Sequence, residues 1–142
     1  MNERTKARVR ERAGQRCEYC HLHQDDSPLA ALHVEHILPK IHGGTDDLDN
    51  LALACIDCNL HKGPNLTGMD PQTNQVTGLF HPRRHLWEEH FLVADVQIEG
   101  RTATGRATIV VLGMNEDRRL KLRWELAAGD RRSKSNFLDK GE

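Results

Sequence analysis

Blocks of apolar and polar positions along this chain predict short helices and strands in mixed order. Residues 2–13 lack proline and glycine and are rich in Arg, Lys, Glu and Ala, which predicts a helix. Residues 32–37 are largely apolar or β-compatible and stop before a proline, as a short strand does. Residues 51–55 alternate Leu or Cys with Ala, which indicates a second strand, and residues 56–62 predict a helix that stops at a Gly-Pro pair.

The second half of the chain has a weaker pattern. Residues 65–78 are punctuated by glycine, proline and asparagine, so we expect an extended surface connection. Residues 85–92 show apolar spacing typical of a helix. Alternation followed by turn residues and a β-branched run predicts a hairpin within residues 95–112. Asn115 is placed to cap a final helix that ends near residue 128.

Length and composition indicate one small domain with additions at its end. The chain has 142 residues, of which 37% are hydrophobic and only 4% aromatic, so its core is modest. We expect the main domain over residues 1–92, an extension over residues 93–129, and a charged tail over residues 130–142 that frays. The formal net charge is −1, so attraction to nucleic acid must come from local basic patches.

Four cysteines form two Cys-x-x-Cys pairs. The chain has neither a secretion-like segment at its start nor a long apolar run, so we expect a cytoplasmic protein with reduced thiols. Two such pairs then predict a closed tetrahedral zinc site, which is structural because no position is left for water. His21 and His23 follow the first pair and are alternative ligands. The four predicted ligands are Cys17, Cys20, Cys55 and Cys58.

A second group of residues suits phosphodiester hydrolysis. Such a reaction needs a base for the attacking water and positive charge at the phosphate and at the leaving oxygen. His36 is a suitable base, since an unperturbed imidazole is largely neutral near pH 7. Glu35 beside it and Asn59 on the following helix offer oxygen ligands of the kind that Mg²⁺ or Mn²⁺ prefers.

The stretches HVEHILPKIHGG and DDLDNLALACIDCN, with the Lys-Gly that follows, resemble the HNH endonucleases. The resemblance implies an α+β protein with a ββα-metal core stapled by the zinc site. It also implies His36 as general base, Glu35 and Asn59 as ligands of a catalytic Mg²⁺ or Mn²⁺, and Asn50 as the organiser of the loop. Here Glu stands where the family commonly has Asp. Neighbouring residues of an ideal strand face opposite ways, so a site shared by Glu35 and His36 requires local irregularity.

Partners follow from the same resemblance. DNA is the expected substrate in preference to RNA, and a double-strand break would need a homodimer, a larger complex or two separate nicks. Expected phosphate contacts, against the alternative of solvated charge, are Lys40, Lys62, Arg83 and Arg84. Two other interpretations stay open: a non-catalytic zinc-stapled nucleic-acid-binding module, and a protein-interaction module that uses the C-terminal hairpin.

Overall fold

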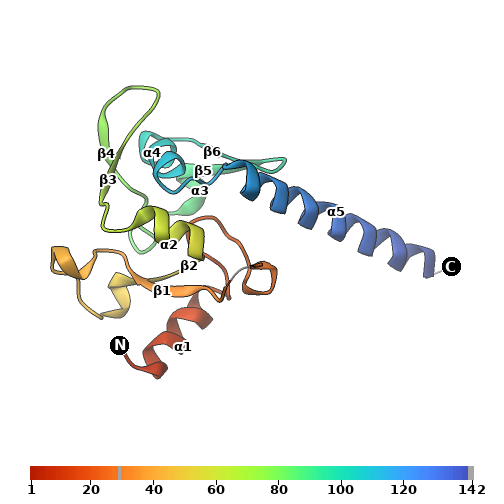
Figure 1. Ribbon diagram of the computed structural model, residues 1–142, viewed down its shortest axis with the longest axis horizontal. Helices are drawn as coiled ribbons and strands as arrows, with labels where there is room; N and C mark the ends of the chain where they lie inside the picture. Colours follow the sequence, from red (N-terminus) through yellow and green to blue (C-terminus); the bar gives the residue numbers. More distant parts are fainter. Residues whose placement is uncertain (29, 141–142) are drawn as a thin grey trace.

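The computed structural model describes residues 1–28 and 30–140, with side chains through residue 129. Within that part, the protein is a mixed α+β fold of five helices and three two-stranded antiparallel sheets, which confirms the predicted class (Figure 1). The helices are α1 (Glu3–Arg12), α2 (Ile56–Lys62), α3 (Trp87–His90), α4 (Ala103–Val111) and α5 (Asp117–Lys140). The strands are β1 (His33–His36), β2 (Leu51–Ala54), β3 (Thr67–Met69), β4 (Val76–Gly78), β5 (Phe91–Ala94) and β6 (Gln97–Gly100).

The β1–β2 ribbon is the centre of the N-terminal half. It pairs His33 with Ala54 and His36 with Leu51, and it lies between α1 and α2 (Figure 1). All four β2 residues are buried. Because helices cover the ribbon from both sides, β2 carries apolar side chains on both faces, which explains its uninterrupted Leu-Ala-Leu-Ala sequence. The predicted elements of this half agree with the structure to within two residues.

The region after α2 corrects one expectation. Residues 65–78 were expected to be an extended connection, but they contain the β3–β4 hairpin, in which Met69 pairs with Val76. Asp70 next to the turn is fully buried and accepts two hydrogen bonds from Arg106 of α4, at 2.9 and 2.8 Å. A paired buried carboxylate holds the hairpin in place, and this long-range pairing is invisible to local turn patterns.

The β-branched run was also misassigned. A hairpin is present, but its strands β5 and β6 span residues 91–100, so the helix expected over residues 85–92 ends at His90. Residues 103–111 form α4 and not a returning strand. Thr102 caps α4 by accepting a hydrogen bond from the Gly105 amide at 3.0 Å. Thr108 donates to the Thr104 carbonyl and accepts from the Phe80 amide, so its buried hydroxyl is satisfied within a helix. Tertiary contacts therefore override the β-propensity of this segment.

The expected last helix starts and ends elsewhere. The side chain of Asn115 does not cap it, but bonds to the amide and the carbonyl of Ile98 at 2.9 and 2.7 Å. α5 begins at Asp117 and continues to Lys140, past the expected end near residue 128. The predicted charged tail, residues 130–142, lies outside the residues whose side chains are described. Among the described helices, none is both long and apolar enough to cross a bilayer.

Candidate functional site

The four predicted cysteines converge. Their sulfur atoms all lie within 4.8 Å of one another, and the Sγ atoms of Cys20 and Cys55 are 3.6 Å apart. Sulfurs at about 2.3 Å from a tetrahedral zinc ion would be about 3.8 Å apart, so the donor set fits zinc. The first pair lies in the loop after α1 and the second opens α2, where Cys55 accepts a hydrogen bond from the Cys58 amide. The cysteines are positioned as a zinc site.

Neither alternative histidine belongs to this cluster. The ring of His21 stacks on Trp87 with centroids 4.0 Å apart. The Nδ1 atom of His23 accepts a hydrogen bond from the Asp25 amide at 3.0 Å. In the part of the chain that the structure describes, the four cysteines are the only group of three or more His, Cys, Asp or Glu residues placed to share an ion.

Arg119 of α5 completes the surroundings of the cysteines. It is 5% exposed, and its Nη2 donates to the sulfur of Cys58 at 3.0 Å, while Nη1 donates to the carbonyls of Leu112 and Gly113. None of the ion pairs in the described region gives this guanidinium a carboxylate partner. A buried cation needs compensating negative charge, and the thiolates of a metal-bound cluster supply it. The contact spans 61 residues of sequence, and no local motif marks it.

Glu35 faces inward. Its Oε1 accepts a hydrogen bond from the hydroxyl of Tyr19, which lies between the two cysteines of the first pair, and its Oε2 lies 3.1 Å from Lys62 Nζ. Glu35 is 8% exposed. Burial raises the pKa of its carboxyl group, while the Lys62 ammonium and the Tyr19 hydroxyl act in the opposite direction. The loop that carries the first cysteine pair and β1 are thus joined through one buried carboxylate.

Lys62 is not available to nucleic acid, which corrects its predicted role. It is 2% exposed, and besides Glu35 its Nζ donates to the carbonyls of His36 and Ile37 at 3.3 and 2.9 Å. These three acceptors use all three ammonium protons. Lys62 therefore connects the C-terminal end of β1 to α2, and all its ammonium protons are used inside the fold.

Arg83 is also committed to the fold, which removes it from the expected phosphate contacts. It forms an ion pair with Glu18, and both side chains are mostly buried. The other oxygen of Glu18 accepts from the Leu53 amide at 2.8 Å, so this pair braces β2. Of the four predicted cationic contacts, Lys40 and Arg84 remain exposed.

His36 faces a different partner from Glu35. Its Nε2 lies 2.7 Å from Asp46 Oδ1, and this hydrogen bond lowers the pKa of Asp46 to about 2. A carboxylate accepts only, so the neutral ring carries its proton on Nε2 and leaves Nδ1 as an acceptor. We did not single out Asp46 from the sequence, where it reads as one of several turn residues.

β1 lacks the irregularity that a site shared by Glu35 and His36 was expected to need. Glu35 pairs with Ala52 and His36 with Leu51 in regular register. Their functional groups consequently bond to separate partners. Both residues, with Asn59 and Lys40, nevertheless line one open depression of about 370 Å³. The predicted base and the predicted oxygen ligands are therefore neighbours around one surface.

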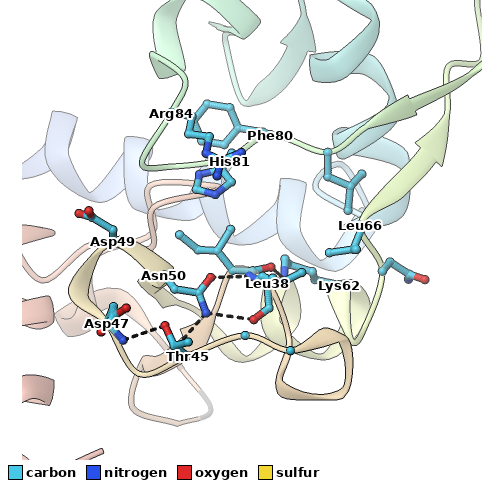
Figure 2. A pocket seen from close by; sticks show the side chains of 15 residues that line it. Leu38, Thr45, Asp47, Asp49, Asn50, Lys62, Leu66, Phe80, His81 and Arg84 are labelled. Atoms are coloured by element: carbon cyan, nitrogen blue, oxygen red, sulfur yellow. Dashed lines mark hydrogen bonds between the residues drawn. The ribbon is translucent and has the colours of Figure 1, made fainter.

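Asn50 clips the loop between the two strands. Its Oδ1 accepts from the Leu38 amide at 2.8 Å, and its Nδ2 donates to the carbonyls of Leu38 and Thr45 (Figure 2). Gly44 is required beside it, because a Cβ there would lie 1.7 Å from the Leu38 carbonyl oxygen. The clipped loop forms one wall of a second cavity, of about 430 Å³, which His81 and Arg84 also line (Figure 2).

The comparison with protein families agrees with this geometry. The family model described as HNH endonuclease matches residues 17–65. The match covers 49 of the 142 residues, and we call these residues the HNH segment. The HNH segment begins at the first cysteine and ends just after α2, so it holds both cysteine pairs, β1, the clipped loop, β2 and α2. Neither a curated protein nor a solved structure matches the chain significantly. Arg119 contacts the cysteines from outside the HNH segment.

Replacing Arg119 tests whether α5 helps to retain zinc. We expect Arg119→Ala to weaken zinc binding about 10- to 100-fold, as loss of an outer hydrogen-bond partner of a metal ligand does. The measurement is zinc transfer to a chromophoric chelator. Arg118→Ala is the matched control, since Arg118 lies on the same helix but pairs with Asp57. Equal zinc transfer from both variants would contradict the role of Arg119.

Replacing Lys62 tests the buried pair. Lys62→Met should lower the free energy of unfolding by about 3 kcal/mol, because it leaves the Glu35 carboxylate buried without its cation. The double variant Glu35→Gln/Lys62→Met should recover most of that loss, since it removes both charges. Urea denaturation of the zinc-loaded chains measures both effects. If the double variant were no more stable than the single one, the pair would not be the cause.

Proposed function

We propose that the HNH segment is a metal-dependent endonuclease that hydrolyses phosphodiester bonds in DNA. The observation that carries the proposal is the depression lined together by Glu35, His36 and Asn59. It combines an imidazole with two side chains that offer oxygen ligands, which is the set that hydrolysis of a phosphodiester needs. The family match supports nuclease chemistry in general.

His36 would act as the general base. With Nε2 held by Asp46, the free Nδ1 is the atom that accepts a proton from the attacking water. Asp46 prevents ring rotation and stabilises the imidazolium that forms. Lys62 restrains the same residue from behind by holding its carbonyl oxygen. The base is therefore oriented from both its side chain and its backbone.

Glu35 and Asn59 would hold the catalytic Mg²⁺ or Mn²⁺. An ionised carboxylate has about four acceptor positions, and Tyr19 and Lys62 use two, so Glu35 retains capacity for a metal ion. When bound, such an ion supplies Lewis-acid stabilisation of the charge on the phosphate and on the departing 3′ oxygen. The resemblance to the family then implies 5′-phosphate and 3′-hydroxyl ends.

The remaining groups have supporting roles in this proposal. Asn50 keeps the loop that carries Asp46 in one conformation. The zinc of the four-cysteine cluster is structural, because four sulfurs leave no ligand position for water. Arg84 and Lys40 are the exposed candidates for phosphate contact. The oligomeric state and the cytoplasmic location stay predictions from the sequence.

One observation favours a second candidate function, a non-catalytic zinc-stapled module that binds nucleic acid. Lys62 already places a positive charge 3.1 Å from the Glu35 carboxylate. An ammonium in that position opposes the binding of a divalent cation by like-charge repulsion. If the repulsion outweighs the attraction, the depression would bind nucleic acid without cleaving it.

Plasmid nicking distinguishes the two functions. We expect the zinc-loaded chain to nick supercoiled plasmid with Mg²⁺ or Mn²⁺, and His36→Ala to reduce the rate by about 10²- to 10⁴-fold, the usual contribution of a general base. Zinc content and circular dichroism show that the variant folds. Equal nicking by both chains would defeat the mechanism. Binding of DNA without nicking by either would establish the second function.

Removing the partner of the base gives an independent test. Asp46→Ala should lower kcat about 10- to 100-fold with little change in KM, because it disorders the base without touching the substrate. Asp47→Ala is the matched control, since it removes the same charge from the neighbouring position. Steady-state nicking rates measure both. A rise in KM at constant kcat would instead assign Asp46 to substrate binding.

A further inference from the structure

An exposed arginine row lies on α1, outside the HNH segment. Arg4 and Arg8 are both exposed, and their spacing of four residues places them on the same side of the helix. Among the described hydrogen bonds and ion pairs, neither guanidinium has a partner. Asn2 caps the helix by accepting from the Thr5 amide at 2.8 Å, so the row is displayed by an ordered helix start.

Contacts at both ends of the row show what it lies beside. Arg12, four residues past Arg8, donates to the carbonyls of Leu48 and Leu51 at 3.0 and 2.7 Å. At the other end, the main-chain nitrogen of Met1 lies 3.1 Å from Asp46 Oδ2. The row therefore runs along the loop that carries Asp46.

The same end of the row lies next to the proposed base. Asp46, which the start of α1 approaches, holds the ring of His36 through its other oxygen. Lys40 reaches this point as well, with its Nζ 3.7 Å from Asp46 and its side chain 66% exposed. Lys40 thus lies beside the carboxylate that holds His36, and Arg4 and Arg8 are on the helix whose start approaches the same carboxylate.

We propose that Arg4 and Arg8, together with Lys40, form a contact surface for the phosphate backbone of duplex DNA. The proposal rests on the proposed function, because it positions the backbone with a phosphodiester bond at His36. The chain as a whole carries a net charge of −1, so binding requires a local surface of this kind. Some nearby acids already have partners: Asp46 is held by His36, Glu3 lies 3.5 Å from Lys6, and Asp49 interacts with Arg12. Glu11 on α1 and Asp47 on the loop are also exposed. Arginines that meet phosphates release counterions, which makes the affinity steeply dependent on salt.

The salt dependence of binding measures the number of these contacts. The probe is a DNA duplex of about 30 base pairs, titrated with the zinc-loaded 142-residue chain carrying His36→Ala, so that the duplex stays intact. Removing two phosphate contacts with Arg4→Ala/Arg8→Ala should reduce the slope of log K against log salt concentration by about 1.8. Alanine favours helix, so α1 is preserved, and circular dichroism with zinc content verifies this.

The control variant is Arg101→Ala/Lys121→Ala, which removes the same charge from exposed positions in the C-terminal half and should leave the slope unchanged. Three results would each overturn the proposed surface. The α1 variant and its parent could show equal slopes, the parent could bind without salt dependence, or the matching RNA duplex could bind more tightly than the DNA. Absence of nicking by the His36-containing chain, with the slope change intact, would defeat the nuclease function and support the surface.

Discussion

The meeting of four cysteine sulfurs constrains most of the structure around it. The first pair follows α1 and the second opens α2, so the cluster ties the N-terminal helix to the β1–β2–α2 unit. A buried guanidinium from α5 then contacts the sulfurs, so the C-terminal part is held to the same point. In a chain with few aromatic residues, closing long loops at one site offsets the small hydrophobic core.

Polar contacts connect the cysteine cluster to β1. Tyr19, between two zinc cysteines, bonds to Glu35, and Glu35 pairs with Lys62. Lys62 in turn holds the backbone of His36 and Ile37. A buried network of this kind is costly unless every member is satisfied, and here each has partners. It keeps the end of β1 in one conformation, which a general base requires.

The two faces of β1 have different contacts. Glu35 faces the interior and joins strand, zinc loop and α2, while His36 faces Asp46 and the start of α1. Regular pairing with β2 sends neighbouring side chains to separate partners. The interior network provides rigidity, and the outer face provides an oriented imidazole beside exposed cations. Such an arrangement places the proposed base next to the surface proposed to bind a polyanion.

Local patterns were sufficient for α1, β1, β2 and α2, because apolar periodicity, caps and Gly-Pro stops act over a few residues. Cys-x-x-Cys spacing likewise predicted that the four cysteines come together, and the structure positions them as a zinc site. The sequence alone did not show whether a charged side chain points to solvent or into the fold. Lys62 and Arg83 look like phosphate contacts, but partners 27 and 65 residues away draw them into the fold. For the same reason the sequence did not reveal the contact of Arg119 with the cysteines, the contact of Asp46 with His36, or the helical state of α4. Each depends on a neighbour that only chain packing supplies.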